Sequence, residues 1–183
     1  MKQLDVRIYW RATDPLLTPE AQSAAARALL QTALERDYEI KGPVELITDA
    51  PGKKPYLKNS KLQTSITHTA GLVACAVSNV PVGIDAQAGR PIKEGLPKRV
   101  MSPQELSGYD RRESTFFRLW THKESALKQL GLGLAGGMRS VVFDPYSFKC
   151  LSHPQFSFFY TVQNGIHLSV CAPQGSAFSL FSV

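Results

Sequence analysis

Residues 116–134, FFRLWTHKESALKQLGLGL, constrain the fold most, because they combine a clear helical pattern with charges in unexpected places. At about 100° per residue the apolar side chains fall on one stripe, which predicts a long helix packed on a core. The stripe comprises Phe116, Leu119, Trp120, Leu127 and Leu130. Lys123 falls near its centre, and Glu124 and Lys128 lie together on one flank, four residues apart. The helix therefore carries these charges either along the surface or around a charged ligand.

The first alternative is ordinary. Lys123 would snorkel along apolar surface, and Glu124 with Lys128 would form an exposed ion pair contributing less than about 1 kcal/mol. Two other segments favour the second alternative. PVGIDAQ runs an apolar strand straight into Asp85, and a buried carboxylate is costly unless it is paired or binds a metal. ITHTAG places His68 between two hydroxyls and beside a glycine, a combination that suits phosphate oxygens. Taken singly, each segment is explained as well by a turn cap or an exposed turn histidine.

The order of predicted elements indicates an α+β fold. Strands are predicted over residues 4–10, 44–48, 72–77, 82–85, 141–143, 156–162 and 166–172, with residues 86–97 as a loop. A helix is predicted over Pro19–Tyr38, with Thr18 as its N-cap, and a shorter one within Val100–Tyr109. The SPQE sequence that begins at Ser102 has the form of a capping box. The similarity of LVACAVS to HLSVCAP hints at two related halves.

Composition bounds the class of protein. The chain has 183 residues, 43% of them hydrophobic and 20% charged, as in a soluble globular domain. No apolar run approaches the roughly 18 residues of a membrane span, and the charged start lacks a signal-peptide core, so we expect a cytoplasmic protein. The three cysteines lie in apolar runs without metal-ligand spacing, which predicts buried free thiols. A net charge of +6 favours an anionic partner, although solubility alone would also explain it.

Four motifs in order, KPYL, ITHTAG, VGIDAQ and FFRLWTHKESALKQLGLGL, resemble those of the 4′-phosphopantetheinyl transferases of the Sfp type. The family pattern is a GKP-like turn, an (N/S)-x-S-H segment, V-G-(I/V)-D-x-E, and W-(S/T)-x-K-E-(A/S)-x-x-K. The match runs from about Lys54 to Leu134, and the last motif is the most specific. The resemblance implies two similar halves, each a helix packed on an antiparallel sheet and related by a pseudo-two-fold axis. The halves would be residues 1–80, with the coenzyme A-binding segments, and residues 81–183, with the metal and catalytic motifs.

The resemblance also implies an activity, in which such enzymes move the phosphopantetheine arm of coenzyme A onto a serine of an acyl or peptidyl carrier protein and leave 3′,5′-ADP. Mg²⁺ would assist, and the partner would be an acidic apo carrier protein. A monomer could form the whole site, with no nucleic acid and no membrane involved. By the match, Asp85 and Glu124 are expected metal ligands, Glu124 helps to remove the serine proton, and Lys128 clamps phosphate. The residues expected to bind coenzyme A are Arg27, Lys54, Thr67, His68, Lys123 and Lys128.

The sequence departs from the family pattern at Gln87, where the family has a glutamate. An amide can still coordinate a metal through its oxygen or hold a metal-bound water, with one less negative charge. Another pattern, GLGLAG at residues 131–136, matches a dinucleotide fingerprint, but it follows a helix rather than a strand. We interpret it as a helix end and a loop.

Two other functions compete with the transferase. One is a non-catalytic homologue that binds coenzyme A or a carrier protein with a weakened metal site. The other is a basic nucleic-acid-binding domain, although its aromatics, among them Phe116, Trp120 and Phe158, are patterned as core rather than as stacking residues.

Overall fold

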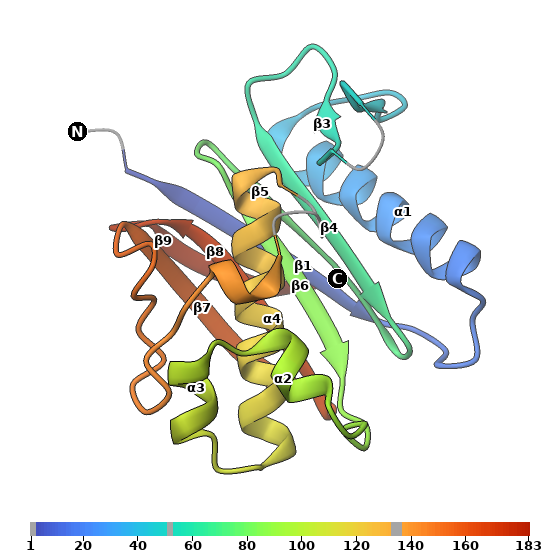
Figure 1. Cartoon of the computed structure of the whole chain (residues 1–183). Coiled ribbons are helices and arrows are strands. Elements are labelled where there is room, and N and C mark those ends of the chain that lie inside the picture. The colour runs from blue at the N-terminus through green and yellow to red at the C-terminus, as the bar shows by residue number, and fades with distance from the viewer. Residues whose placement is uncertain (1–2, 51–52, 133–136) are drawn as a thin grey trace.

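The computed structural model describes residues 3–50, 53–132 and 137–183, and within them it has an α+β architecture (Figure 1). The strands are β1 (Asp5–Ala12), β2 (Leu46–Ile47), β3 (Tyr56–Leu57), β4 (Gln63–Thr69), β5 (Leu72–Ser78), β6 (Gly83–Ala88), β7 (Phe156–Gln163), β8 (Ile166–Pro173) and β9 (Ala177–Ser182). The helices are α1 (Pro19–Tyr38), α2 (Leu96–Val100), α3 (Pro103–Gly108), α4 (Glu113–Leu130) and the 3₁₀ turn η2 (Met138–Ser140).

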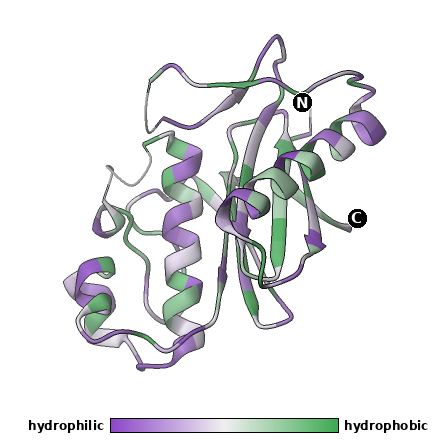
Figure 2. Cartoon of the chain, turned by 90° about the vertical axis from the view of Figure 1, so that its right-hand side faces the viewer, coloured by the Kyte–Doolittle hydropathy of each residue, from purple (hydrophilic) through white to green (hydrophobic). Residues whose placement is uncertain are grey.

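Two main sheets lie face to face between the two long helices. The first sheet has the order β4-β5-β1-β9 and the second the order β6-β8-β7, while β2 and β3 form a separate small pair. One apolar cluster joins the two sheets through residues such as Ile8, Ala74, Ile84 and Val170. A second packs α1 on the first sheet, and a third packs α4 on the second. Figure 2 shows the same order, with hydrophobic strand segments between the helices.

Helices α1 and α3 begin at predicted capping residues, and α4 ends at a glycine. Thr18 Oγ1 accepts the Ala21 N–H, and Pro19 occupies the first turn of α1, as predicted. The predicted capping box of α3 is also confirmed, since Ser102 and Glu105 bond each other's backbone N–H groups. Helix α4 ends at Gly131, which has a left-handed φ of 70°. A residue with a side chain would adopt this φ only with strain. The remainder of the GLGLAG pattern, residues 133–136, lies outside the described residues.

The strand predictions were incomplete in three places. Residues 63–69, where no strand was predicted, form β4 and a hairpin with β5. Residues 177–182, not predicted as a strand, form β9, which pairs in parallel with β1. Residues 141–143 form no strand, and a single bridge joins Phe143 to Cys150. The strands predicted over residues 156–162 and 166–172 are confirmed as β7 and β8, which pair as a hairpin. All three cysteines are buried and free, as expected.

Because β9 returns to the first sheet, the two sheets do not divide cleanly at residue 80. The mixed α+β class is confirmed, and the pseudo-two-fold relation between the halves stays a prediction. No helix among the described residues is long and apolar enough to span a membrane.

The two sheets also meet along the β4–β6 seam, where side chains replace the usual backbone ladder. Ser65 Oγ, Thr67 Oγ1 and Thr69 Oγ1 accept the N–H groups of Ile84, Ala86 and Ala88 at 3.2, 3.0 and 3.3 Å. Each acceptor is two residues beyond the last, so all three hydroxyls project from one face of β4. The bonds satisfy the backbone edge of β6 and fix its register beside β4.

We predict that Ser65→Ala, by leaving the buried Ile84 N–H without its acceptor, lowers the free energy of unfolding by about 1–3 kcal/mol. Urea denaturation would measure the change. Ser107→Ala is the matched control, because that serine is exposed and its hydroxyl bonds only the nearby Gln104 carbonyl. Equal stability of the two variants would contradict a stabilising role for the seam hydroxyls.

Candidate active site

The β4–β6 seam brings the second half's acidic motif beside the first half's basic one. On β6, Ile84 and Ala86 enter the core between the sheets, so Gly83, Asp85 and Gln87 face the opposite side, toward α4. Helix α4 approaches closely because position 83 has no side chain: a Cβ there would lie 1.9 Å from the Ser125 carbonyl oxygen. This contact sets the distance at which Asp85 meets the charged residues of α4.

Asp85, Glu124 and Lys128 form the centre of the site. Lys128 Nζ donates to Asp85 Oδ1 at 2.8 Å and to the Ile84 carbonyl at 2.9 Å. Asp85 and Glu124 are each only 8% exposed. The alternative in which Glu124 and Lys128 form an exposed surface pair is wrong, because Lys128 is instead paired with Asp85 across the helix–strand contact. The structure thus brings together the three predicted catalytic residues.

Both carboxyl groups of the site are harder to ionise than they would be in water, because they are buried. Burial raises the pKa of Asp85, against the opposing effects of Lys128 and of a hydrogen bond from Thr67. Burial, and then the charge of Asp85, raise the pKa of Glu124 to about 7, although Lys128 lowers it. A carboxyl group with a pKa close to neutrality can exchange a proton at physiological pH.

Two lysines that precede β3, Lys53 and Lys54, line a cavity with Lys128. Lys54 Nζ donates to the Val82 carbonyl at 2.5 Å, and burial followed by repulsion from Lys128 lowers the pKa of Lys54 to about 8. Lys53, Lys54 and Lys128 line a cavity of about 190 Å³ together with residues of β4. Two lysines that repel each other leave this cavity suited to an anion.

His68 and Arg27 lie further along β4 and α1. Both line an open depression of about 510 Å³ beside α1. His68 Nδ1 is 3.2 Å from Gln22 Oε1, and burial followed by Lys128 lowers the pKa of His68. The neighbouring Thr67 is buried, and its hydroxyl serves the seam. Arg27 and His68 thus line this depression, whereas Lys54 lines the smaller cavity and the Thr67 hydroxyl faces β6.

Lys123 does not lie where we expected it. Its side chain was expected to bind coenzyme A, but it is fully buried on the other side of α4. Its Nζ donates to Glu105 Oε2 at 2.8 Å and to the carbonyls of Met138 and Val141. Glu105 also accepts the N–H groups of Ser102 and Phe143, so the pair joins α3, η2 and the middle of α4. Lys123 neither snorkels to solvent nor reaches the site, because three acceptors already surround its ammonium group.

The residues present fit a cation that needs few protein ligands. Asp85 and Glu124 offer hard oxygens, and Gln87 lies on the same face of β6. Gln87 Nε2 donates to the Ala88 carbonyl at 3.2 Å, which leaves the amide oxygen as the atom available to a cation. The described residues contain no group of three or more His, Cys, Asp or Glu side chains able to hold a metal. Mg²⁺ commonly uses one or two carboxylates and completes its shell with water and substrate phosphates, so the set is adequate.

Sequence reasoning missed Gln22, Ser65 and the role of Thr67 and Thr69 as acceptors for the backbone of β6; Thr67 was expected to bind coenzyme A. The alternation Ser65, Thr67, Thr69 is visible in the sequence and is typical of one face of a strand, but its acceptor role depends on where β6 lies. Gln22 gave no signal, since α1 meets β4 only in three dimensions.

Comparisons of the sequence with known proteins identify its family. The sequence model of the 4′-phosphopantetheinyl transferase superfamily matches residues 81–171. The chain is 30% identical over 162 residues to the 4′-phosphopantetheinyl transferase Sfp of Bacillus subtilis (strain 168), covering 79% of this chain and 70% of that relative. It is 31% identical over 106 residues to psf-1 of Bacillus pumilus, and 32% identical over 124 residues to HetI of Nostoc sp. (strain PCC 7120 / SAG 25.82 / UTEX 2576). These two matches cover 54% and 61% of this chain, and 46% and 52% of the relatives.

The chain therefore belongs to the 4′-phosphopantetheinyl transferase superfamily, and it is a transferase enzyme. The resemblance found from the four motifs is confirmed.

We predict that Lys123→Met destabilises the protein by about 3–5 kcal/mol, because it leaves the Glu105 carboxylate buried without its cation. Glu105→Gln should also destabilise it. The double variant should lose less than the sum of the two, since neither charge then remains unpaired. Lys149→Met, at an exposed lysine, is the control for loss of positive charge. Urea denaturation of all four variants decides, and additive losses would show that the two residues do not act as a pair.

Proposed function

We propose that the chain transfers the 4′-phosphopantetheine group of coenzyme A to a serine of an apo acyl or peptidyl carrier protein, with Mg²⁺, and releases 3′,5′-ADP. The observation that carries this proposal is the opposition of charges at the β4–β6 seam. Burial and the charge of Asp85 raise the pKa of Glu124, which favours a bound cation. Burial and the charge of Lys128 lower the pKa of Lys54, which has no ion-pair partner among the described residues, and this favours a bound anion. A diphosphate with a divalent cation supplies both at once.

In the proposed reaction the serine Oγ attacks the β-phosphorus of coenzyme A. The bond from that phosphorus to the oxygen bridging it to the α-phosphate breaks, and the bridging oxygen leaves with 3′,5′-ADP. Asp85, Glu124 and the amide oxygen of Gln87 would hold Mg²⁺, which when bound neutralises charge on the diphosphate. Lys128 and Lys54 would hold the phosphate oxygens beside the small cavity that they line.

Glu124 is the proposed acceptor of the serine proton. Its pKa of about 7 lets a carboxylate oxygen take the proton directly or through an ordered water near neutral pH. His68 and Arg27 line the depression along α1, which suits the nucleotide and its phosphates. The cytoplasmic location, the monomeric state and the acidic carrier protein stay predictions of the sequence.

The alternative of a homologue that binds coenzyme A or a carrier protein without turnover rests on Gln87, because this amide replaces a carboxylate on the face of β6 that carries Asp85. The match to transferases counts against this alternative. Turnover that depends on Mg²⁺ would exclude it.

The test is mass spectrometry of several apo carrier proteins incubated with coenzyme A and Mg²⁺. Wild-type protein should add one phosphopantetheine mass to at least one carrier, and Glu124→Gln should reduce kcat/KM by roughly 10²-fold or more. The helix should survive, because glutamine is nearly as good a helix former as glutamate. Glu113→Gln, in the exposed first turn of the same helix, is the matched control. Near-wild-type turnover in folded Glu124→Gln would remove Glu124 from the mechanism.

Position 87 makes a separate prediction. Gln87→Glu adds a carboxylate two residues beyond Asp85, on the same face of β6, and should lower the Mg²⁺ concentration at half-saturation. Coulomb attraction at about 4 Å with an effective dielectric of 20 is roughly 4 kcal/mol, of which desolvation and repulsion from Asp85 cancel a large part.

A Mg²⁺ titration of carrier modification measures the effect of Gln87→Glu. Gln174→Glu, an exposed substitution of the same type, controls for net charge. Equal or weaker Mg²⁺ dependence in Gln87→Glu would mean that position 87 does not face the cation.

A further inference from the structure

A pocket of about 740 Å³ lies between α4, residues 147–150 and the edge strand β7. We call it the β7 pocket. Helix α4 contributes Arg118 and His122, which lie four residues apart and therefore share one face of the helix. That face is roughly 120° around the helix from Glu124 and Lys128, so the pocket is separate from the candidate active site. Its volume is in the range of small-molecule sites in proteins.

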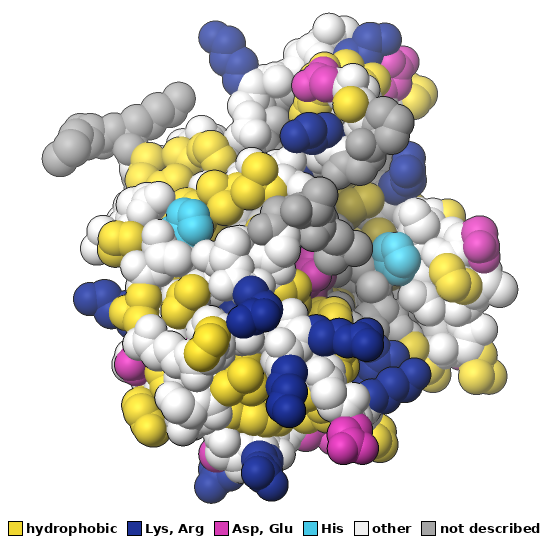
Figure 3. Space-filling model, viewed as in Figure 1, with side chains coloured by type: hydrophobic (Ala, Val, Ile, Leu, Met, Phe, Trp, Pro, Cys, Tyr) yellow, Lys and Arg dark blue, Asp and Glu magenta, His cyan; other side chains and the backbone are white. Residues whose placement is uncertain are grey.

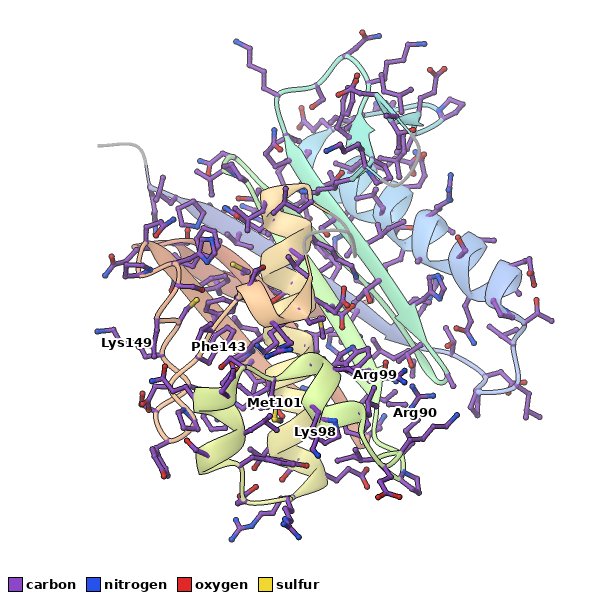
Figure 4. The ribbon with its side chains drawn as sticks, in the orientation of Figure 1. Arg90, Lys98, Arg99, Met101, Phe143 and Lys149 are labelled. Carbon is purple, nitrogen blue, oxygen red and sulfur yellow. The ribbon has the colours of Figure 1, made fainter. Side chains whose placement is uncertain are left out.

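Aromatic side chains from two segments line the β7 pocket: Phe148, Phe156, Phe158, Phe159 and Tyr160. All five are partly exposed. Figure 4 shows Lys149, which also lines the pocket, at the outer edge of the molecule, on the side opposite to Arg99. In Figure 3 basic side chains gather over α2, and few lie over β7 and the loop before it. The pocket thus offers aromatic rings to a ligand, away from the main basic surface.

Arg118 is a half-buried cation inside this pocket. Its guanidinium lies 3.9 Å from the ring centroid of Phe148 and 4.8 Å from that of Tyr160. Among the described residues, Arg118 has no ion-pair partner, and its one hydrogen bond runs from Nε to His122 Nε2 at 3.5 Å. Burial lowers the pKa of Arg118, as expected for a cation without a charged partner. The two rings attract the charge, but the terminal N–H groups still need an acceptor.

His122 fixes the guanidinium without adding a charge. It is buried, and its ring centroid lies 5.0 Å from that of Phe158 and 5.5 Å from that of Tyr160. His122 Nδ1 is 2.8 Å from Ser169 Oγ, so the neutral tautomer with its hydrogen on Nδ1 satisfies both Ser169 and Arg118. Burial, and then the charge of Arg118, lower the pKa of His122 to about 3. At neutral pH the charge that faces the interior of the pocket is therefore that of Arg118.

We propose that the β7 pocket binds a small aromatic carboxylate, with the carboxylate on the terminal nitrogens of Arg118 and the ring among the aromatic side chains. A carboxylate matches the planar fork of a guanidinium through two parallel hydrogen bonds. A flat ring can stack on the phenyl rings of the wall or meet their edges. If Arg118 served packing alone, its terminal N–H groups would remain bonded to water. The proposal does not rest on the proposed function, because binding is measured without turnover.

The test is a titration of the full chain with 2-naphthoate, followed by the histidine ring signals in NMR spectra. We expect a Kd on the order of 1 mM or lower, as for other ligands of this size. The signals of His122 should shift, and those of His68, beside α1, should not. 2-Naphthamide keeps the rings and lacks the charge, so it should bind about 10-fold more weakly or worse. This comparison uses wild-type protein alone.

A variant tests the part of Arg118. Arg118→Gln should weaken 2-naphthoate on the order of 10-fold and change the affinity for 2-naphthamide by less than about twofold. Arg99→Gln is the matched control, because it removes the same charge from an exposed arginine outside the β7 pocket. Its affinity for 2-naphthoate should equal that of wild type.

Four outcomes overturn the proposal. Equal affinity of wild-type protein for the acid and the amide would show that the rings bind without the charge. Shifts of His68 in place of His122 would move the anion to the depression beside α1. Inorganic phosphate that binds the pocket as tightly as 2-naphthoate would make it a site for a simple anion. Unshifted His122 signals at ten times the expected Kd would show that the pocket takes no aromatic carboxylate.

Discussion

The β4–β6 seam is the contact on which the rest of the molecule depends. β6 has β8 on one side, and on the other side its N–H groups bond to hydroxyl side chains instead of to a strand. Those bonds satisfy the buried polar edge and join the two sheets at the same time. They also determine that Asp85, on β6, lies beside Thr67, on β4. The arrangement of the candidate active site therefore depends on the hydrogen bonds between the N–H groups of β6 and the hydroxyls of β4.

Burial and charge oppose each other at this seam. Asp85 and Glu124 are both buried, and one lysine, Lys128, is paired with Asp85. Lys54 is in the opposite situation, because burial and the charge of Lys128 lower its pKa to about 8. Such groups would cost stability in a purely structural contact. A substrate that carries both a cation and phosphate groups relieves both penalties.

The two lysines of α4 illustrate how neighbouring charges take separate tasks. Lys128 faces β6, where it bonds Asp85 in the candidate active site. Lys123 faces the interior, where Glu105 and two carbonyl groups surround it. Five residues separate them, which is about 140° around a helix, so they cannot share one ligand. The buried pair of Lys123 and Glu105 holds α3 and η2 against α4.

The sequence by itself determined the helices, the family and most of the site. The caps at Thr18 and Ser102 are local, because the bonds they make lie within a few residues. Asp85, Glu124 and Lys128 were found from spaced motifs, because the chemistry needs those side chains and the spacing is carried by the chain. Tertiary structure alone decided three things: that β9 returns to β1, that Lys123 points inward, and that Ser65 and Thr67 accept the N–H groups of β6. Each of these depends on a partner distant in sequence, and a periodic pattern states which face a residue occupies without stating what that face will meet.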